Sequence, residues 1–225
     1  MDQKMLNQTT TMLSRDRLQH EDTLVVSDPF PLFVSQNQLA EDLADDLERD
    51  FPSQKEAGYL PFEEADCGPS VRAVVDEMIS PEIADAIGDQ LGLPNLSQYP
   101  TMVSICRSLK KHHGKIHTDS KSKIVTALLY LNPGWMESSD GCLRFLKAID
   151  DFESLVVPEV RPIYGTLAAF RRADNSFHGH LPFQGERRVI QVAWLTSEEE
   201  KLRKTRRGRT SRFLKWVTGS LSGQG

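Results

Sequence analysis

Hydrophobic residues recur at helical spacing in the first half of the chain and in short runs in the second half. Near the start, "TLVVSDPFPLFV" (23–34) combines a β-branched run with two prolines, which predicts an early strand leading into a turn. Ser35 is a candidate helix cap, because Leu39, Leu43 and Leu47 follow at four-residue spacing with acids on the opposite face. This spacing predicts a helix after residue 35.

Two further helices are predicted by "GPSVRAVVDEMISPEIADAIGDQLGL" (68–93). Pro81 divides the segment, since proline is tolerated at the start of a helix but not in its interior. Gly92 and Pro94 then end the helical region. The predicted buried face carries the apolar residues Val74, Val75, Met78, Ile79, Ile83, Ile87 and Leu91.

Beyond residue 100 the pattern changes to short β-rich runs separated by proline and glycine turns. Six to eight strands at about ten-residue spacing predict an antiparallel sandwich or barrel, with the helices packed outside it. The run "IVTALLYL" is apolar at nearly every position, as expected for a strand covered on both faces. The runs are "TMVSICRSL", "KIVTALLYLN", "GCLRFL", "LVVPEV", "GTLAAF", "SFHGHL" and "RRVIQVAWL".

Length and composition favour one domain with appended segments: the chain has 225 residues and 39% hydrophobic residues. No apolar run reaches the length of a membrane span, and the polar start does not resemble a signal peptide, so we expect a cytoplasmic protein. Cys67, Cys106 and Cys142 are odd in number and lack C-x-x-C spacing. This argues against a disulfide framework and against a thiolate zinc site.

Charge is unevenly distributed along the chain. The net charge is −5, but residues 201–225 contain eight Lys and Arg and no acid, which leaves −13 for residues 1–200. Thr196 or Ser197 is expected to cap a last helix. For the basic tail we consider a solvated or self-docked segment, an anionic membrane surface or acidic partner bound through residues 201–217, and nucleic acid.

Candidate metal chemistry begins at His117 and Asp119, whose i, i+2 spacing places both side chains on one face of a strand. A redox-active Fe(II) site of this type needs two neutral imidazoles and one carboxylate, leaving positions open for substrates. A second histidine must therefore come from a distant strand, and His178 and His180 are both candidates on spacing alone. Arg188 lies at the start of the last β run, and its guanidinium could bind a carboxylate through two parallel hydrogen bonds.

Five motifs in order make residues 100–195 resemble the Fe(II)- and 2-oxoglutarate-dependent dioxygenases of the prolyl 4-hydroxylase-like branch. The motifs are His117-Thr118-Asp119, "VTALLYLN", "GCLRFL", "PIYGTLAAF" and "HGHLPFQGERR". The resemblance implies a double-stranded β-helix (jelly-roll) core. It also implies Fe(II) as metal, 2-oxoglutarate as co-substrate, O₂ as oxidant and ascorbate as a supporting reductant.

Roles carried over by position make His117, Asp119 and His178 the iron ligands, with His178 preferred because Pro182 follows four residues later. Arg188 would bind the distal (C5) carboxylate of 2-oxoglutarate, assisted by the hydroxyl of Tyr130. Arg187 is the rival, since the offset from the histidine varies by one. Arg188 is preferred because it stands six residues before Trp194.

The resulting prediction is a mainly β chain with α-helices. It has a flexible segment over 1–22, one dioxygenase domain over 23–197 (helical buttress 35–95, β core 100–195) and a basic tail over 198–225. The predicted function is hydroxylation of an unactivated C–H bond, with release of succinate and CO₂. The alternatives are a cupin-like metalloenzyme without 2-oxoglutarate and a non-catalytic barrel that binds through its tail.

Four further residues are expected either at the substrate entrance or in structural contacts: His112, His113, Trp135 and Arg144. The sequence does not distinguish a peptidyl substrate from a small molecule.

Overall fold

The computed structural model describes residues 11–54, 56–136 and 138–205. Its main feature is a seven-stranded sheet in the order β1-β2-β7-β5-β9-β4-β3, in which every pairing is antiparallel. No helix in these ranges is long and apolar enough to cross a membrane. The strands are β1 Leu24–Val26, β2 Leu32–Ser35, β3 Tyr59–Pro61, β4 Thr101–Leu109, β5 Lys123–Tyr130, β7 Leu167–Arg171 and β9 Gly185–Leu195.

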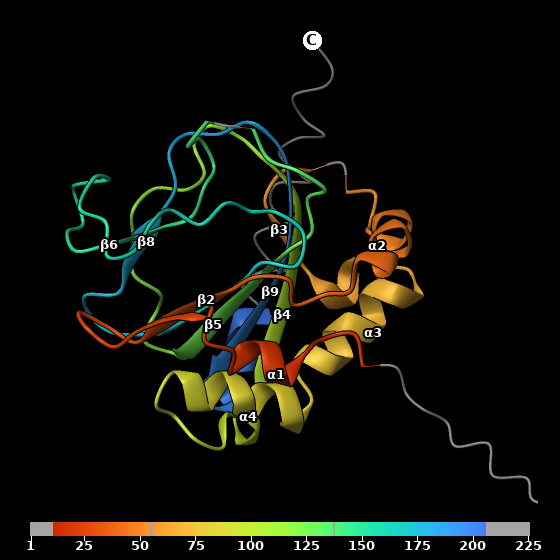
Figure 1. Ribbon diagram of the computed structural model, residues 1–225, viewed down its shortest axis with the longest axis horizontal. Coiled ribbons are helices and arrows are strands. Elements are labelled where there is room, and N and C mark those ends of the chain that lie inside the picture. Colours follow the sequence, from red (N-terminus) through yellow and green to blue (C-terminus); the bar gives the residue numbers. More distant parts are fainter. Residues whose placement is uncertain (1–10, 55, 137, 206–225) are drawn as a thin grey trace, which may run out of the picture.

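A smaller sheet, β6 (Arg144–Leu146) with β8 (Phe177–Gly179), faces the main sheet and closes the jelly roll (Figure 1). Isolated bridges extend it: His117 pairs with His178, Val160 with Leu143, and Leu155 with Leu146. The run "LVVPEV" therefore forms single bridges in place of the expected strand, because Pro158 within it has no N–H to donate. The predicted jelly-roll core is confirmed.

Helices cover the opposite face of the main sheet (Figure 1). They are α1 (Arg15–Leu18), α2 (Ala44–Asp50), α3 (Pro69–Met78) and α4 (Pro81–Gln90), with 3₁₀ turns at Glu41–Leu43, Phe62–Glu64 and Leu96–Gln98. The predicted break at Pro81 is present, and Ser80 caps α4 by accepting a hydrogen bond from the Ile83 N–H. The predicted helical buttress is therefore built mainly by α3 and α4.

Alternation along the strands divides the apolar residues into two cores. On β9, Ile190, Val192 and Trp194 join the core under the helices, whereas Val189 joins the core between the two sheets. Strand β5 splits in the same way, with Leu129 toward the helices and Tyr130 toward the interior. Odd and even residues of one strand thus serve two different environments.

Two expected boundaries differ from the structure. Ser35 does not cap a helix: it ends β2, where it pairs with Leu167, and its hydroxyl donates to the Arg17 carbonyl. Helical structure begins only at Glu41. Within the segment expected to be flexible, residues 15–18 form α1, and Leu18 is fully buried.

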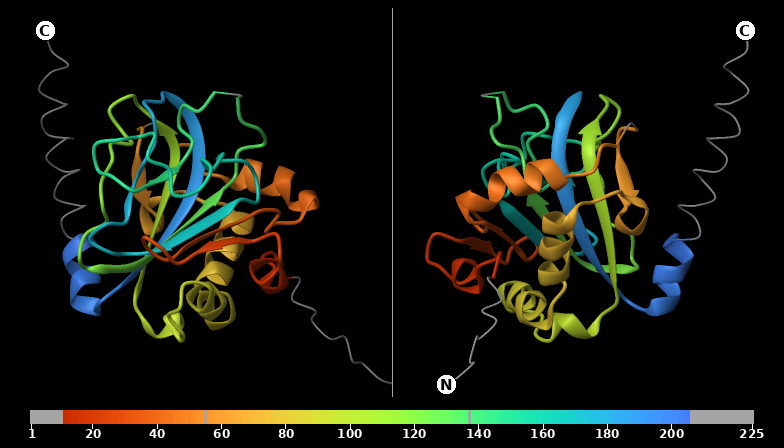
Figure 2. Two further views of the ribbon diagram at one scale, coloured as in Figure 1. Left: turned by 60° about the vertical axis from the view of Figure 1, so that its left-hand side comes forward. Right: turned by 90° about the vertical axis from the view of Figure 1, so that its right-hand side faces the viewer.

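A last helix begins after Ser197, whose hydroxyl accepts a hydrogen bond from the Glu200 N–H, and continues through residues 198–205. Ser197 is thus the cap, one of the two candidates that the sequence offers. Figure 2 shows this helix in blue, on the side of the molecule opposite α1 and α4. The sequence predicts a basic tail over 198–225; this helix forms its first part, and residues 206–225 lie outside the described residues.

Candidate iron centre and co-substrate pocket

Three of the predicted site residues meet at one point. One ligand atom from each of His117, Asp119 and His178 lies within 4.8 Å of the other two. In the described parts of the chain this is the only group of His, Cys, Asp and Glu that meets this geometry. The spacing is small enough for all three atoms to coordinate one cation.

Backbone pairing between two distant segments creates this meeting point. The N–H of His117 donates to the His178 carbonyl, and the N–H of His178 donates to the His117 carbonyl, both at 3.0 Å. The loop can approach β8 this closely because Gly114 has φ +86°, and a Cβ there would come within 2.1 Å of the His180 ring. The pair His117 and Asp119 therefore stands in a bridged loop before β5, where the sequence predicted a strand.

Hydrogen bonds to the backbone orient both imidazoles. His117 Nδ1 lies 2.9 Å from the Lys115 carbonyl, and His178 Nδ1 lies 3.0 Å from the Ser176 carbonyl. A carbonyl only accepts, so Nδ1 carries the proton on both rings and Nε2 keeps its lone pair for a metal. Burial lowers the pKa of His178 to about 4, against the opposing effect of Asp119. The His178 ring is therefore neutral near pH 7, as a ligand must be.

Asp119 is buried and held at both oxygens. Lys123 Nζ donates to Oδ1 at 2.7 Å, and Thr126 Oγ1 donates to Oδ2 at 2.6 Å. Burial is the largest single influence on the pKa of Asp119 and would raise it, but the charges of Lys123 and His178 and the hydrogen bonds from Lys123 and Thr126 together outweigh burial, so the pKa is lowered. Each carboxylate oxygen retains a further lone pair. Asp119 can thus act as an anionic ligand while these two residues fix its orientation.

This donor set fits Fe(II). Two neutral imidazoles and one carboxylate are the ligand set of non-haem Fe(II) oxygenases, and half of an octahedral shell is left for substrates. The site's surroundings also provide the support that metal ligands require, since each of the three side chains is held by another group. His117, Asp119 and His178 are therefore the residues that would hold the iron.

A buried guanidinium lies in the interior at a second position. Arg187 is 3% exposed, donates from Nε to the Gly141 carbonyl at 2.9 Å and from Nη2 to the Tyr130 hydroxyl at 3.0 Å. Its Cζ also lies 4.9 Å from the centre of the Tyr130 ring. In the described residues, no carboxylate forms an ion pair with Arg187. A buried cation without a counter-charge is costly, so Arg187 is a candidate residue for binding an anion.

The structure does not bring Arg188, the residue preferred from the sequence, to this pocket. Its side chain lies on the helix-facing side of β9, where it donates to Glu186 at 2.7 Å and to Glu48 of α2 at 3.0 Å. Its backbone N–H donates to the Asn132 side chain. Arg188 thus connects β9 to α2, and it shares a face with Trp194 because six residues along a strand return to the same side.

Two phenols accompany Arg187. Tyr130 is fully buried, and burial raises the pKa of its hydroxyl, so the hydroxyl remains protonated near pH 7. The charge of Arg187 also acts on the Tyr59 hydroxyl, although the Tyr59 residue as a whole is 44% exposed. Sequence reasoning missed Tyr59, because its strand has only three residues and reaches the site by pairing with β4.

The remaining histidines do not join the metal cluster. His180 is buried, and its Nδ1 lies 2.8 Å from the Leu181 carbonyl. Burial, and next the charge of Arg187, lower the pKa of His180 to about 4. His112 and His113 lie with ring centres 4.2 Å apart on the loop before the site, and His113 Nδ1 accepts from the Lys110 N–H. Their role at an entrance stays a prediction.

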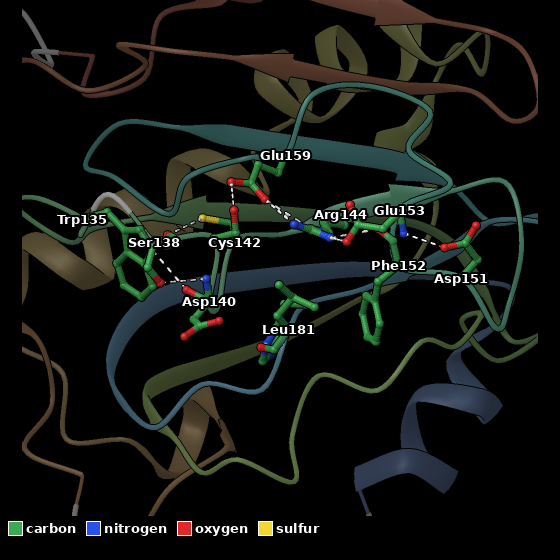
Figure 3. A network of polar contacts seen from close by, with 12 residues as sticks. Trp135, Ser138, Asp140, Cys142, Arg144, Asp151, Phe152, Glu153, Glu159 and Leu181 are labelled. Atoms are coloured by element: carbon green, nitrogen blue, oxygen red, sulfur yellow. Dashed lines mark hydrogen bonds and ion pairs between the residues drawn. The ribbon is translucent and has the colours of Figure 1, made fainter.

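Arg144 and Trp135 make structural contacts in a polar network on the smaller sheet and its neighbouring loops (Figure 3). Arg144 forms ion pairs with Glu153 at 2.7 Å and Glu159 at 2.9 Å. Trp135 packs on Phe183 and donates from its indole N–H to the Asp140 carbonyl. These contacts account for both side chains without a substrate.

Comparison with known proteins agrees with this geometry. Residues 100–196 match the family model of the 2OG-Fe(II) oxygenase superfamily. A prolyl-4-hydroxylase structure from Pseudomonas putida aligns with a TM-score of 0.54 and 20% identity, covering 74% of this chain and 87% of that one. A prolyl 4-hydroxylase structure from Phytophthora capsici aligns with a TM-score of 0.52 and 21% identity, covering 82% of this chain and 63% of that one. Comparison with curated protein sequences finds no significant match.

The structural matches, at this level of identity, establish the fold, and the family match covers the segment that holds all three candidate ligands. Fe(II), 2-oxoglutarate and O₂ are accordingly the metal, co-substrate and oxidant of the family. Residues 100–196 thus match the model of the 2OG-Fe(II) oxygenase superfamily, and the chain has the fold of the prolyl 4-hydroxylase structures.

Proposed function

We propose that the chain hydroxylates an unactivated C–H bond of a prime substrate, with 2-oxoglutarate converted to succinate and CO₂. The observation that carries this proposal is the pairing of two sites in one interior: a three-ligand cluster, and a buried guanidinium that pairs with no carboxylate among the described residues. A dicarboxylate co-substrate needs both, because one end must reach the metal while the other carboxylate requires a cation. A cupin-like metalloenzyme without 2-oxoglutarate has no use for Arg187.

We assign the co-substrate anchor to Arg187 and Tyr130, which reverses the choice between Arg187 and Arg188 made from the sequence. The Tyr130 oxygen accepts from Arg187 and still has its own O–H to donate to a carboxylate. The guanidinium is fixed by the Gly141 carbonyl. Gly141 has φ +74°, and a Cβ there would lie 2.8 Å from the Phe183 ring, so a larger residue would disturb this support.

Iron, when bound, supplies the activation of O₂ and the oxidation of the C–H bond. The chain's own residues orient the reactants around it. His117 and His178 present Nε2 because their Nδ1 atoms are bonded to carbonyls, and Lys123 with Thr126 holds the Asp119 carboxylate in place. The apolar interior around Phe145 and Phe170 excludes bulk water from one side of the site.

The test is formation of succinate from 2-oxoglutarate with Fe(II), ascorbate and O₂, measured in the absence of a prime substrate. We expect slow uncoupled turnover by the natural chain and a loss of at least about a hundredfold in Asp119→Ala, because a ligand is removed. Asp174→Ala is the matched control: Asp174 is also an acid, bonded to Arg172, and lies outside the ligand cluster. Absence of both Fe(II) binding and 2-oxoglutarate turnover in the natural chain would refute the proposal.

A further inference from the structure

The segment that carries two of the candidate ligands is rich in lysine. Residues 110–123 contain five lysines and a single acid, Asp119, on a chain whose net charge is −5. Half of the residues in this segment, His117 among them, are exposed to solvent. The approach to the proposed iron site is therefore locally cationic on an acidic protein.

Contacts from two distant parts of the chain add cations to this approach. Arg172 Nε donates to the Asp119 carbonyl at 3.4 Å, and Lys204 of the last helix donates to the Ser120 hydroxyl at 2.8 Å. We define the cationic rim as Lys115, Lys121, Lys123, Arg172 and Lys204. The first three lie within four residues of a candidate ligand, and the last two donate hydrogen bonds to Asp119 and Ser120.

The acids near the rim, which include the exposed Glu198 and Glu199 of the last helix, offset only part of its charge. Asp119 is paired with Lys123 and is itself a candidate metal ligand, and Asp174 is paired with Arg172. Glu200 of the last helix is paired with Arg203, which is a further cation. Burial, followed by the charge of Lys123, lowers the pKa of Lys204, which is consistent with crowding of like charges.

The rim is also extended. It spans an exposed loop, the end of β7 and the last helix, and in the sequence five more Lys and Arg with no acid follow between residues 206 and 215. A single small anion would need only one or two of these cations. A chain of negative charges can use several of them at once, which favours a long ligand over a small one.

We propose that the prime substrate is an acidic polypeptide segment and that the cationic rim binds it beside the iron site. This proposal rests on the proposed function, and it names the substrate class of that site. The rim would bring an acidic segment across the exposed face of His117, so that a residue of the segment lies against the open side of the metal. The last helix is then part of the substrate-binding surface through Lys204.

The test measures fluorescence anisotropy of two labelled octapeptides, one alternating Glu and Gly and one alternating Lys and Gly. The full chain is used with Mn(II) and saturating 2-oxoglutarate, so that the pocket is filled without turnover. We expect only the acidic peptide to bind, with an affinity that falls as salt rises. Lys204→Glu and Lys121→Glu should each weaken binding about tenfold, because each reverses a charge beside the peptide.

Arg15→Glu is the matched control, since it makes the same charge change on α1, on the opposite side of the molecule (Figure 2), and should change affinity less than about twofold. Equal binding of both peptides, or of neither, would overturn the proposal. So would displacement of the acidic peptide by glutarate at an equal concentration of carboxylates, which would indicate a site for a small anion. Loss of binding on deletion of residues 206–225, with no effect of Lys204→Glu or Lys121→Glu, would also exclude the rim.

This experiment does not depend on catalysis. If the protein binds the acidic peptide through the rim but forms no succinate, the proposed function is wrong and the binding surface stands. If the protein forms succinate but does not bind the peptide, the proposed function stands and the proposed substrate class is wrong.

Discussion

Arg187 and Arg188 are consecutive residues of the same type on β9, yet their side chains lie in different environments. Arg187 points between the two sheets, where Tyr130 and the Gly141 carbonyl hold it and no carboxylate in the described part of the chain pairs with it. Arg188 points to the helix layer, where Glu48 and Glu186 neutralise it. The comparison shows that the interior face of the main sheet carries the candidate binding groups, whereas the helix-facing side carries contacts that hold the fold together.

The largest expected effect is on the helix-facing side, at Trp194. This side chain is fully buried in the core beneath the helices. Trp194→Ala should lower the free energy of unfolding by about 3–5 kcal/mol, because it removes a large aromatic group and leaves a cavity. Urea unfolding measures this loss. At a temperature where the variant is folded, its KM for 2-oxoglutarate should stay within about twofold of the natural value, since Trp194 lies outside the pocket; a large rise in KM would break the proposed division between faces.

The interior face should behave in the opposite way at Arg187. Arg187→Gln should raise the KM for 2-oxoglutarate about a hundredfold, because it removes the cation that faces the distal carboxylate. Steady-state succinate formation measures this change. The stability of the protein without co-substrate should fall little or rise, because a buried charge without a counter-charge is removed. A strong loss of stability with unchanged KM would instead make Arg187 a structural residue.

The period of two along β9 is the part of this division that the sequence could have revealed. Ile190, Val192 and Trp194 stand at even positions, and large apolar residues in alternate positions predict the face that packs on the helices. Arg188 has the same parity, so its spacing from Trp194 argues for the helix-facing side. The family pattern favours Arg188 for the interior, whereas the alternation favours Arg187, and the structure agrees with the alternation.

Other features of the site depend on contacts that spacing cannot predict. The helices from residue 69 to 90, the long strands and the His117, Asp119, His178 set were all predicted, because each has a strong local pattern or motif. Tyr59 reaches Arg187 only through pairing of β3 with β4, and Lys204 reaches Ser120 only because the last helix folds back on the loop. Such long-range contacts leave no periodic signal in the residues that make them.

Acidic pH should act on the interior face. Burial lowers the pKa of His180 to about 4, whereas an unfolded histidine titrates near 6.5. Between these values the unfolded chain binds a proton that the folded chain does not, so stability is present above about pH 6.5 and falls as pH decreases toward 4. Thermal unfolding of metal-free protein at pH 7 and pH 5 should show this loss. His180→Gln should reduce the pH-dependent part by on the order of 1–2 kcal/mol, and an unchanged pH dependence would show that His180 does not contribute to it.

The smallest expected effect is at Arg188. Arg188→Gln should lower the free energy of unfolding by about 1 kcal/mol, because its two glutamate partners are about half exposed and the surrounding water screens the ion pairs. The KM for 2-oxoglutarate should remain within about twofold, since the side chain faces α2 and lies outside the pocket. Arg187→Gln and Arg188→Gln make the same substitution at neighbouring positions of β9. A difference between their KM values for 2-oxoglutarate therefore reflects the position of the side chain and not its type. A similar rise in KM in both variants would mean that the guanidinium of Arg188 also reaches the co-substrate, and the assignment of the two faces of β9 would then be wrong.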